Sequence, residues 1–405
     1  MSHHHDHAPP PPPARIELPL AMRLVAILAV LAGALSLGWA FESGHPELAW
    51  ISYLIGVFYA LGLGVFGVLW IATLHLCRGV WSVTMRRIPE AMTAWLLPGG
   101  VLAMLVGLGG HTLYHWTHAD VVATDPILAH KAPFLNMTMF YWLMGLSLLS
   151  WVVIAFLMVR NSLRQDEEGG TCLGQTNNAL SALYVVVFGL TISIVSFYLL
   201  MSLDAHWFST MFAVLVYTDI MQTGTAFVAI VAGYLVLRGG LGGFINENHL
   251  HSLGKMVFAC TGFWAYIAFC QFMLIWYANI PEETIYYLRR FDHGWLPYML
   301  VLPLLKFAIP FVAMVPRACK RNPRPLILIC ALILVAQVWE LYVMVGPSVG
   351  HGAEASHGHL PLVEFAVAAG FVGLFYLAFE FHLKRHAPVP LKDPFIQECL
   401  EYHPA

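Results

Sequence analysis

The sequence predicts an all-α integral membrane protein of about ten transmembrane helices, and three observations support this fold class. Of the 405 residues, 59% are apolar and only 11% are charged, whereas soluble domains average roughly half apolar and a quarter charged. Apolar runs of about 20 residues, long enough to cross a bilayer as helices, recur along nearly the whole chain. The alternating pattern of a membrane barrel is absent, so helices are the expected spanning structure.

Residues 1–19, which precede the first apolar run, are predicted to form a tail. It has no small-residue cleavage site and no apolar stretch directly behind a basic one, so it is not typical of a signal peptide. Its proline run, 9–13, predicts a disordered, His- and Pro-rich cytoplasmic tail over residues 1–19. Metal binding is the less favoured interpretation of the histidines in this tail, which are His3, His4, His5 and His7.

Ten apolar runs define a predicted membrane domain, residues 20–382, and a cytoplasmic C-terminal tail follows over 383–405. Many glycines in the second and third runs predict close helix packing without any ligand. The predicted spans are 20–41, 50–76, 94–113, 134–159, 180–203, 208–237, 253–278, 296–315, 325–346 and 361–382.

Basic residues predict the topology. An even number of spans puts both termini on one side, and sixteen of the 20 Lys and Arg residues fall on that side. Positive charge is retained in the cytoplasm, so both termini are predicted to be cytoplasmic. The sixteen are Arg15, Arg23, Arg78, Arg86, Arg87, Arg160, Arg164, Arg238, Lys255, Arg317, Lys320, Arg321, Arg324, Lys384, Arg385 and Lys392.

The loops on the opposite side are acidic, aromatic and rich in histidine. Their aromatic residues, such as Trp116, Tyr286, Tyr287 and Trp295, predict ordered loops that are docked against partner proteins. The loops comprise residues 45–47, 114–131, 203–206, 279–295 and 346–359.

Several classes of function have no support in the sequence. The stretches between spans are too short for a soluble domain, so catalytic and redox modules are expected in partner proteins. The seven cysteines form no C-x-x-C pair, and no two histidines occupy matched depths on facing helices, so no metal, iron–sulfur or haem site is predicted. No catalytic residue and no nucleic-acid partner are expected in this chain.

Ionisable and amide side chains inside the spans are the main functional candidates, because such groups are costly in hydrocarbon. They are concentrated on four consecutive spans of the second half, where a bundle would bring them together. They are Asp219 with Gln222 and Thr223 in the sixth span, Gln271 in the seventh, Lys306 in the eighth, and Gln337 with Glu340 in the ninth.

Two prolines flank the lysine of the eighth span. Proline lacks the amide hydrogen that would bond the carbonyl four residues earlier, and for Pro310 that carbonyl belongs to Lys306. A kink with a free carbonyl beside an ammonium predicts a place for ordered water, and hence a proton path. The alternative is that Lys306 pairs with Asp219 or Glu340 and simply locks the helices together.

A second set of candidates lies at the outward ends of the spans. Asp204 and His206, which link the fifth and sixth spans, and Glu364 at the start of the tenth are candidate proton carriers. They could relay protons or contact a quinone headgroup, because a quinol that loses two electrons must also release two protons to nearby bases. The alternative is an ordinary capping aspartate and an interfacial histidine.

Three segments carry a resemblance to a known family. They are GVWSVTMRRIPEAM (79–92), SFYLLMSLDAHWFSTMFAV (196–214) and HSLGKMVFACTGFWAYIAFCQFMLIWYANIPEET (251–284). With HW at 115–116 and HKAPFLNMTMF at 130–140, they resemble the NrfD-like family of polytopic quinone-oxidoreductase subunits. Within that family they are most similar to the ActF subunits of bacterial alternative complex III, over most of spans two to eight.

The resemblance implies a fold and a set of partners. The implied fold has two four-helix bundles, spans 2–5 and 6–9, flanked by spans 1 and 10. The implied partners are a paralogous NrfD-like membrane subunit, a periplasmic iron–sulfur subunit, c-type cytochrome subunits, small membrane subunits and a terminal oxidase. Haem and iron–sulfur clusters are expected in those subunits, and the lipid-soluble cofactor would be menaquinone or ubiquinone. Which residues of this chain bind quinone, if any, stays open, as does the role of GHGAEASHGH (350–359).

The sequence therefore predicts a subunit, not catalytic alone, of a quinol:electron-acceptor oxidoreductase in a respiratory or photosynthetic chain. It is expected to anchor periplasmic redox subunits and to supply a proton path. The alternatives are a direct quinol-binding subunit of the NrfD or PsrC type, and a purely structural scaffold. A secondary transporter is less favoured, because broken helices are expected at matching positions of two repeats and only the eighth span is broken.

Overall fold

Helices make up every regular element in the part of the chain that the computed structural model describes, residues 15–16, 18–349 and 358–402. Ten helical segments in that part are long and apolar enough to cross a membrane, so the predicted fold class is confirmed. The segments are Leu20–Glu42 (α1), Pro46–Leu76 (α2), Arg87–Leu113 (α3 to α5), Met137–Glu168 (α8), Cys172–Leu199 (α9), Phe212–Leu237 (α10), Glu247–Ala278 (α12), Leu296–Met314 (α14 and α15), Pro323–Ser348 (α17 with a 3-10 turn) and Leu362–Arg385 (α18).

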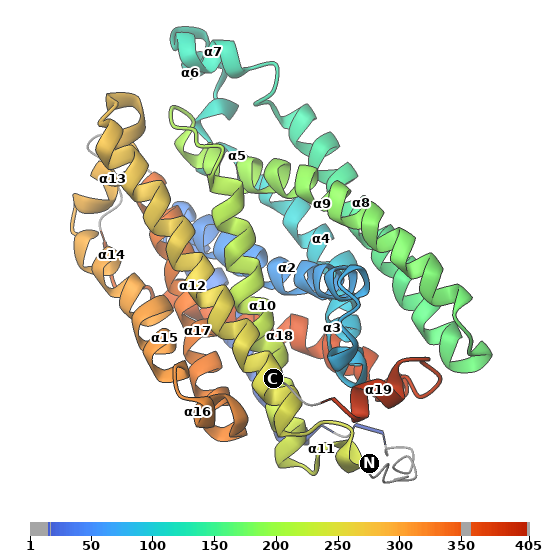
Figure 1. Ribbon diagram of the computed structural model, residues 1–405. Helices are drawn as coiled ribbons and strands as arrows, with labels where there is room; N and C mark the ends of the chain where they lie inside the picture. The colour runs from blue at the N-terminus through green and yellow to red at the C-terminus, as the bar shows by residue number, and fades with distance from the viewer. Residues whose placement is uncertain (1–14, 17, 350–357, 403–405) are drawn as a thin grey trace.

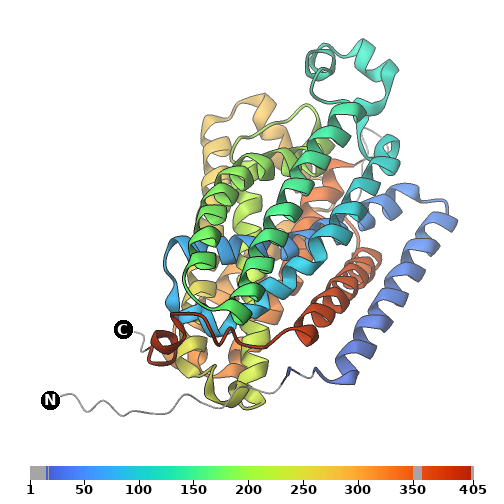
Figure 2. The ribbon, with the colours of Figure 1, turned by 90° about the vertical axis from the view of Figure 1, so that its right-hand side faces the viewer.

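Short helices occupy the ends of the molecule. In Figure 2, α6, α7 and α13 lie at one end, while the start of α1 and the segment α19 lie at the other. This arrangement agrees with an even number of spans. The short helices are α6 (Ala119–Thr124), α7 (Pro126–Lys131), α11 (Gly240–Gly243), α13 (Pro281–Phe291), α16 (Arg317–Arg321) and α19 (Ile396–Leu400).

Several helices run beyond the predicted spans. The predicted ends near residues 159 and 180 lie well inside α8 and α9, which continue to Glu168 and start at Cys172. Hydropathy detects only the length that lies in hydrocarbon, whereas backbone hydrogen bonds continue a helix into water. The two helices are joined at Gly169 and Gly170, which adopt φ angles of 70° and 79° that favour glycine.

The centre of the molecule is α2, which is almost completely buried. It contacts α9, α4 and α3 on one side and α10, α17 and α18 on others. Gly224 of α10 lies against the ring of Phe66, and a Cβ atom at that position would overlap the ring. Helix α1 packs mainly on α18, at one edge of the molecule (Figure 2). The grouping into two separate four-helix bundles stays a prediction.

The C-terminal segment is packed against the membrane domain. After α18, the chain turns back and α19 contacts the 3-10 helix Val80–Met85. Asp393 forms an ion pair with Arg86 at 2.6 Å, and Cys399 is fully buried. The predicted tail 383–405 is therefore ordered over its described part. Residues 1–14 and 17 of the N-terminal tail, and residues 350–357 of the GHGAEASHGH loop, lie outside the described residues.

Candidate functional site

A polar cluster lies inside the membrane domain where α10, α12, α17 and the segment between α14 (Leu296–Pro303) and α15 (Ile309–Met314) meet. In Figure 1, these helices lie side by side in the part of the molecule below α13. Asp219 comes from α10, Glu340 from α17, and Lys306 from the segment between α14 and α15. All three side chains are buried, so the predicted convergence of these residues on neighbouring helices is observed.

Lys306 lies at the centre of the cluster and has no exposed surface. Its Nζ atom lies 2.5 Å from Oδ1 of Asp219 and 2.7 Å from Oε1 of Gln337, and it also contacts Oε2 of Glu340. The ammonium is therefore placed between two carboxylates and an amide oxygen. Its three donors match these three acceptors in number, which is how a buried cation can be stabilised in a membrane.

The backbone around Lys306 follows from the two prolines predicted to kink this span. Residues Leu304–Ala308 form a turn of π-helix directly after Pro303 and before Pro310. The Lys306 carbonyl, which Pro310 cannot bond, accepts a hydrogen bond at 3.0 Å from Nε2 of Gln222. The sequence predicted ordered water at this carbonyl, but a side-chain amide from α10 satisfies it. Single π-helical turns are frequent at functional sites.

Further hydrogen bonds hold the acceptors in place. The Trp264 indole donates to Oε1 of Glu340 at 2.9 Å, and its ring lies 4.9 Å from the Lys306 ammonium. The Thr223 hydroxyl donates to Oε1 of Gln337 at 2.9 Å. Glu340 and Gln337 are therefore each bonded to a second residue besides Lys306, which makes the cluster a connected network.

A small cavity adjoins the cluster on the side of α2. It has a volume of about 20 Å³ and is lined by Tyr59, Asp219, Thr223 and Gln337 together with apolar side chains. A polar cavity of more than about 10 to 15 Å³ can hold one water molecule. The wall of this cavity is almost entirely apolar, so the cavity has the volume of one water but few polar atoms to bind it.

Gln271 is separate from this network. Its side chain is buried on α12, and neither its amide nitrogen nor its amide oxygen has a hydrogen-bond partner in the described part of the chain. It lines a larger cavity of about 750 Å³ that also reaches Trp264 and Glu340. The structure therefore places Gln271 beside the cluster without bonding it to Lys306.

The three outward candidates make separate contacts. Asp204 is buried and forms an ion pair with Arg289 of α13 at 2.8 Å. Nε2 of His206 lies 2.5 Å from Oδ2 of Asp125, which caps α7. This hydrogen bond, with the backbone amides at the start of α7, lowers the pKa of the Asp125 carboxyl.

Glu364 is buried at the start of α18. One of its carboxylate oxygens lies 3.1 Å from Nε2 of His359. His359 is held in turn by Tyr342, whose hydroxyl donates a hydrogen bond to the His359 carbonyl at 2.6 Å. Each outward candidate therefore has its own partner, and the described contacts do not join the three residues into one relay.

The aromatic residues of the outward loops pack inside this chain. Trp116, Tyr286 and Trp295 are buried, and the rings of Trp207 and Tyr286 stack with centroids 4.1 Å apart. Lys131 donates to the Ala205 carbonyl at 2.6 Å, which ties α7 to the same loop. The loops are ordered, as predicted, but their aromatic content is explained by contacts within the chain and does not by itself indicate a partner.

Other buried charges were missed by the sequence analysis, among them Arg87 and Arg290. Arg87 contacts the carboxylates of Glu90 and Asp166 between α3 and α8. Arg290 of α13 is buried, and its acceptors among the described residues are the carbonyls of Tyr286 and Met344 and the Ser348 hydroxyl, all uncharged. The spacing of Arg87 and Glu90, three residues apart on a helix, was a usable signal. Arg290 was assigned to a loop, and nothing in the sequence indicates its burial.

Comparisons with known proteins add no identification. Neither the family models nor the curated proteins that were searched contain a match to this chain. Within residues 15–16, 18–349 and 358–402, no group of three or more His, Cys, Asp or Glu side chains is placed to hold a metal ion.

Proposed function

We propose that this chain is a membrane subunit of a quinol-oxidising complex, and that the Lys306 cluster is a proton-holding site in a path through it. The observation that carries the proposal is the burial of one ammonium between two carboxylates. The proposal also draws on the resemblance of three segments to the NrfD-like family, and in particular to ActF subunits. Partner subunits would hold the haem and iron–sulfur groups that accept electrons.

The charge balance of the cluster supports this role. With Lys306, Asp219 and Glu340 all ionised, the site would carry one net negative charge. A net charge buried in hydrocarbon is costly, so the cluster is neutral only when the two carboxylates share one additional proton. Uptake or release of that proton changes the attraction between Lys306 and its neighbours. A simple lock between helices would need only one carboxylate for one lysine.

The surroundings of the cluster support proton movement as well. The Gln337 amide oxygen accepts from both Thr223 and Lys306, so the polar network extends from the ammonium to the hydroxyl of Thr223. When quinol is oxidised, two electrons pass to the redox groups of the partners and two protons are released to bases. The outward carboxylates of Asp204 and Glu364, each paired with a basic side chain, are candidates to receive them.

The proposed orientation follows from the charge of the loops. Sixteen basic residues lie on the side of the termini, so both termini are cytoplasmic and α13 faces the periplasm of a bacterial cell. In this orientation, α6, α7 and α13 form the surface on which periplasmic redox subunits are anchored.

The test uses the intact complex reconstituted in vesicles, with quinol as electron donor. Glu340→Gln removes one carboxylate while keeping its shape, and we expect proton movement per quinol to fall with electron transfer retained. Glu168→Gln, at an exposed pair with Arg164, is the matched control and should change neither. Unaltered proton movement in Glu340→Gln, in a complex assembled at normal yield, would leave only the scaffold function for this cluster.

A further inference from the structure

A cavity with a volume of about 750 Å³ lies between α12, α13, α14 and α17. Ligand sites in proteins typically have volumes of about 300 to 1,000 Å³. Exposed side chains border the cavity on the outer face of the helices, among them Tyr266, Phe269 and Leu300. In a membrane, this cavity therefore opens toward the lipid chains.

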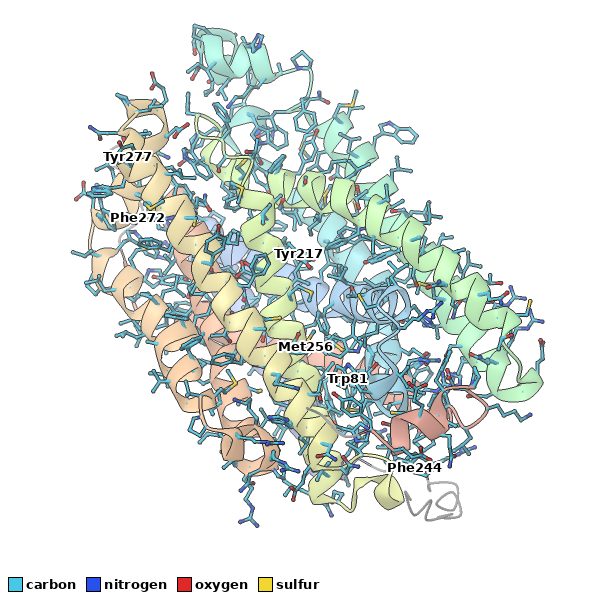
Figure 3. All side chains as sticks on the ribbon, in the orientation of Figure 1. Trp81, Tyr217, Phe244, Met256, Phe272 and Tyr277 are labelled. Carbon is cyan, nitrogen blue, oxygen red and sulfur yellow. The ribbon has the colours of Figure 1, made fainter. Side chains whose placement is uncertain are left out.

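The cavity is long in the direction of the helices. Its wall on α12 extends from Gly262 to Phe272, a rise of about 15 Å at 1.5 Å per residue. Phe272 meets Tyr287 and Phe291 of α13, with ring centroids 5.1 and 6.4 Å apart, so α13 closes this end. Figure 3 labels Phe272 at the end of the molecule where α13 lies. The length is about half of the roughly 30 Å of hydrocarbon in a bilayer, which is the depth of one leaflet.

Arg290 lines the cavity at the end that α13 closes, and its side chain is only 2% exposed. Its Nη atoms donate to the carbonyls of Tyr286 and Met344, at 2.8 and 2.6 Å, and to the Ser348 hydroxyl at 3.0 Å. Its Nε atom is buried and has no hydrogen-bond partner among the described residues. A buried donor of a charged group costs free energy unless a ligand supplies the missing acceptor.

The charge of Arg290 is not balanced by an ion pair within the described residues. Asp204, whose carboxylate attracts Arg290 electrostatically, is bonded to Arg289 at 2.8 Å. Glu340, which also lines the cavity, already contacts Lys306. An arginine keeps its charge in proteins, so Arg289, Arg290 and Asp204 together carry one net positive charge. A net buried charge is costly in a membrane, and an anion from outside the chain is therefore expected beside Arg290.

Gln271 supplies a second polar group in the wall. Its side chain is buried, and neither its amide nitrogen nor its amide oxygen has a partner within the described residues. It precedes Phe272, whose ring meets α13, so it lies on the stretch of α12 nearest that helix. The part of the wall farther from α13 includes Phe307 and Phe311. The cavity thus offers a cation, an amide and an apolar wall, which match the phosphate, the ester carbonyls and the acyl chains of a phospholipid.

We propose that this cavity holds one phospholipid from the leaflet on the side of α13. The lipid phosphate accepts a hydrogen bond from Nε of Arg290, an ester carbonyl accepts one from the Gln271 amide, and an acyl chain fills the apolar part. The net positive charge favours a headgroup without an ammonium of its own, such as that of phosphatidylglycerol. This inference does not depend on the proposed function, because it requires neither quinol nor a proton path.

The test uses the full chain, purified and freed of lipid in an uncharged detergent, with native mass spectrometry to count bound lipids. Phosphatidylglycerol and a diacylglycerol with the same acyl chains are titrated separately. We expect one tightly held phosphatidylglycerol per chain, and binding of diacylglycerol about tenfold weaker or more, the effect of losing a hydrogen bond to a charged group. Arg290→Gln should remove this difference.

A second variant keeps the test decisive if Arg290→Gln does not fold. Ala268→Phe leaves Arg290 in place and fills part of the cavity, so it should abolish the tightly held lipid. Ala259→Phe, on an exposed face of α12 outside the cavity, is the matched control and should bind phosphatidylglycerol as the unmodified chain does.

Three results would overturn the proposal. Equal binding of phosphatidylglycerol to the unmodified chain and to Ala268→Phe would mean that lipid is held only on the outer surface of the helices. Equal affinity for phosphatidylglycerol and diacylglycerol would remove the phosphate from the site. Displacement of the lipid by glycerol 3-phosphate, which has no acyl chains, would assign the site to a soluble phosphate. Because binding is measured on the isolated chain, none of these results bears on proton movement in Glu340→Gln.

Discussion

Replacing Lys306 with methionine is the most direct test of the buried cluster. The change keeps most of the side-chain volume but leaves two carboxylates, Asp219 and Glu340, buried without a cation. Removal of one partner from a buried ion pair typically costs about 3 to 5 kcal/mol. We expect the midpoint of thermal unfolding of the purified chain to fall by several degrees, and the yield of folded chain to fall with it.

Stepwise neutralisation distinguishes charge from shape. The double variant Lys306→Met with Glu340→Gln should recover part of the lost thermal stability, and adding Asp219→Asn should recover most of it. The reason is that a buried ion cluster and an uncharged cluster of similar volume differ little in stability. Lys255→Met, at an exposed position of α12, is the control and should change little. If the triple variant were less stable than Lys306→Met alone, mutual compensation of charge would not be the reason for this cluster.

Three further results are expected. A reporter fused to the C-terminus should be active only in the cytoplasm, and activity in the periplasm would reverse the topology. The hydrogen bond from His206 lowers the pKa of Asp125. The stability that this contact gives to α7 is therefore present above the ordinary pKa of an aspartate and is lost as the pH falls through the lowered pKa. Hydrogen exchange of the α7 amides at a series of pH values can measure the loss. Gly224→Ala should destabilise the chain by about 1 to 3 kcal/mol through overlap with Phe66, whereas Gly189→Ala, with nothing within 4 Å, should not, as thermal unfolding would show.

The part of the fold that depends on composition was predictable. Each of the ten spans was located from its apolar run, because a bilayer demands about 20 apolar residues per helix whatever the packing inside. The convergence of Asp219, Lys306 and Glu340 was predictable for a related reason. Each residue is costly in lipid alone, so their occurrence on neighbouring spans indicated compensation.

The parts that depend on packing were not predictable. Nothing in the sequence distinguishes Trp264, which bonds Glu340, from the many aromatic residues that only anchor helices at the interface. The partner of His206 is Asp125, which comes from another loop, and nothing near His206 in the sequence indicates that contact. Pro310 cannot bond the Lys306 carbonyl, as the sequence predicted, but the hydrogen bond that this carbonyl accepts from Gln222 depends on the rotation of α10.

The pairing of α1 with α18 has a consequence for biosynthesis. The pair is held by Gly33 against Gly370, with backbones in close approach, and by Arg23 and Glu380 at 3.1 Å. These two residues are 357 positions apart, so α1 leaves the ribosome long before its main neighbour, α18, has been synthesised. During that interval, lipid or an insertase must cover the face of α1 that α18 will occupy. A nascent chain stalled before residue 362 would therefore keep α1 without its neighbour, and the factors that bind such unpaired helices could be isolated together with it.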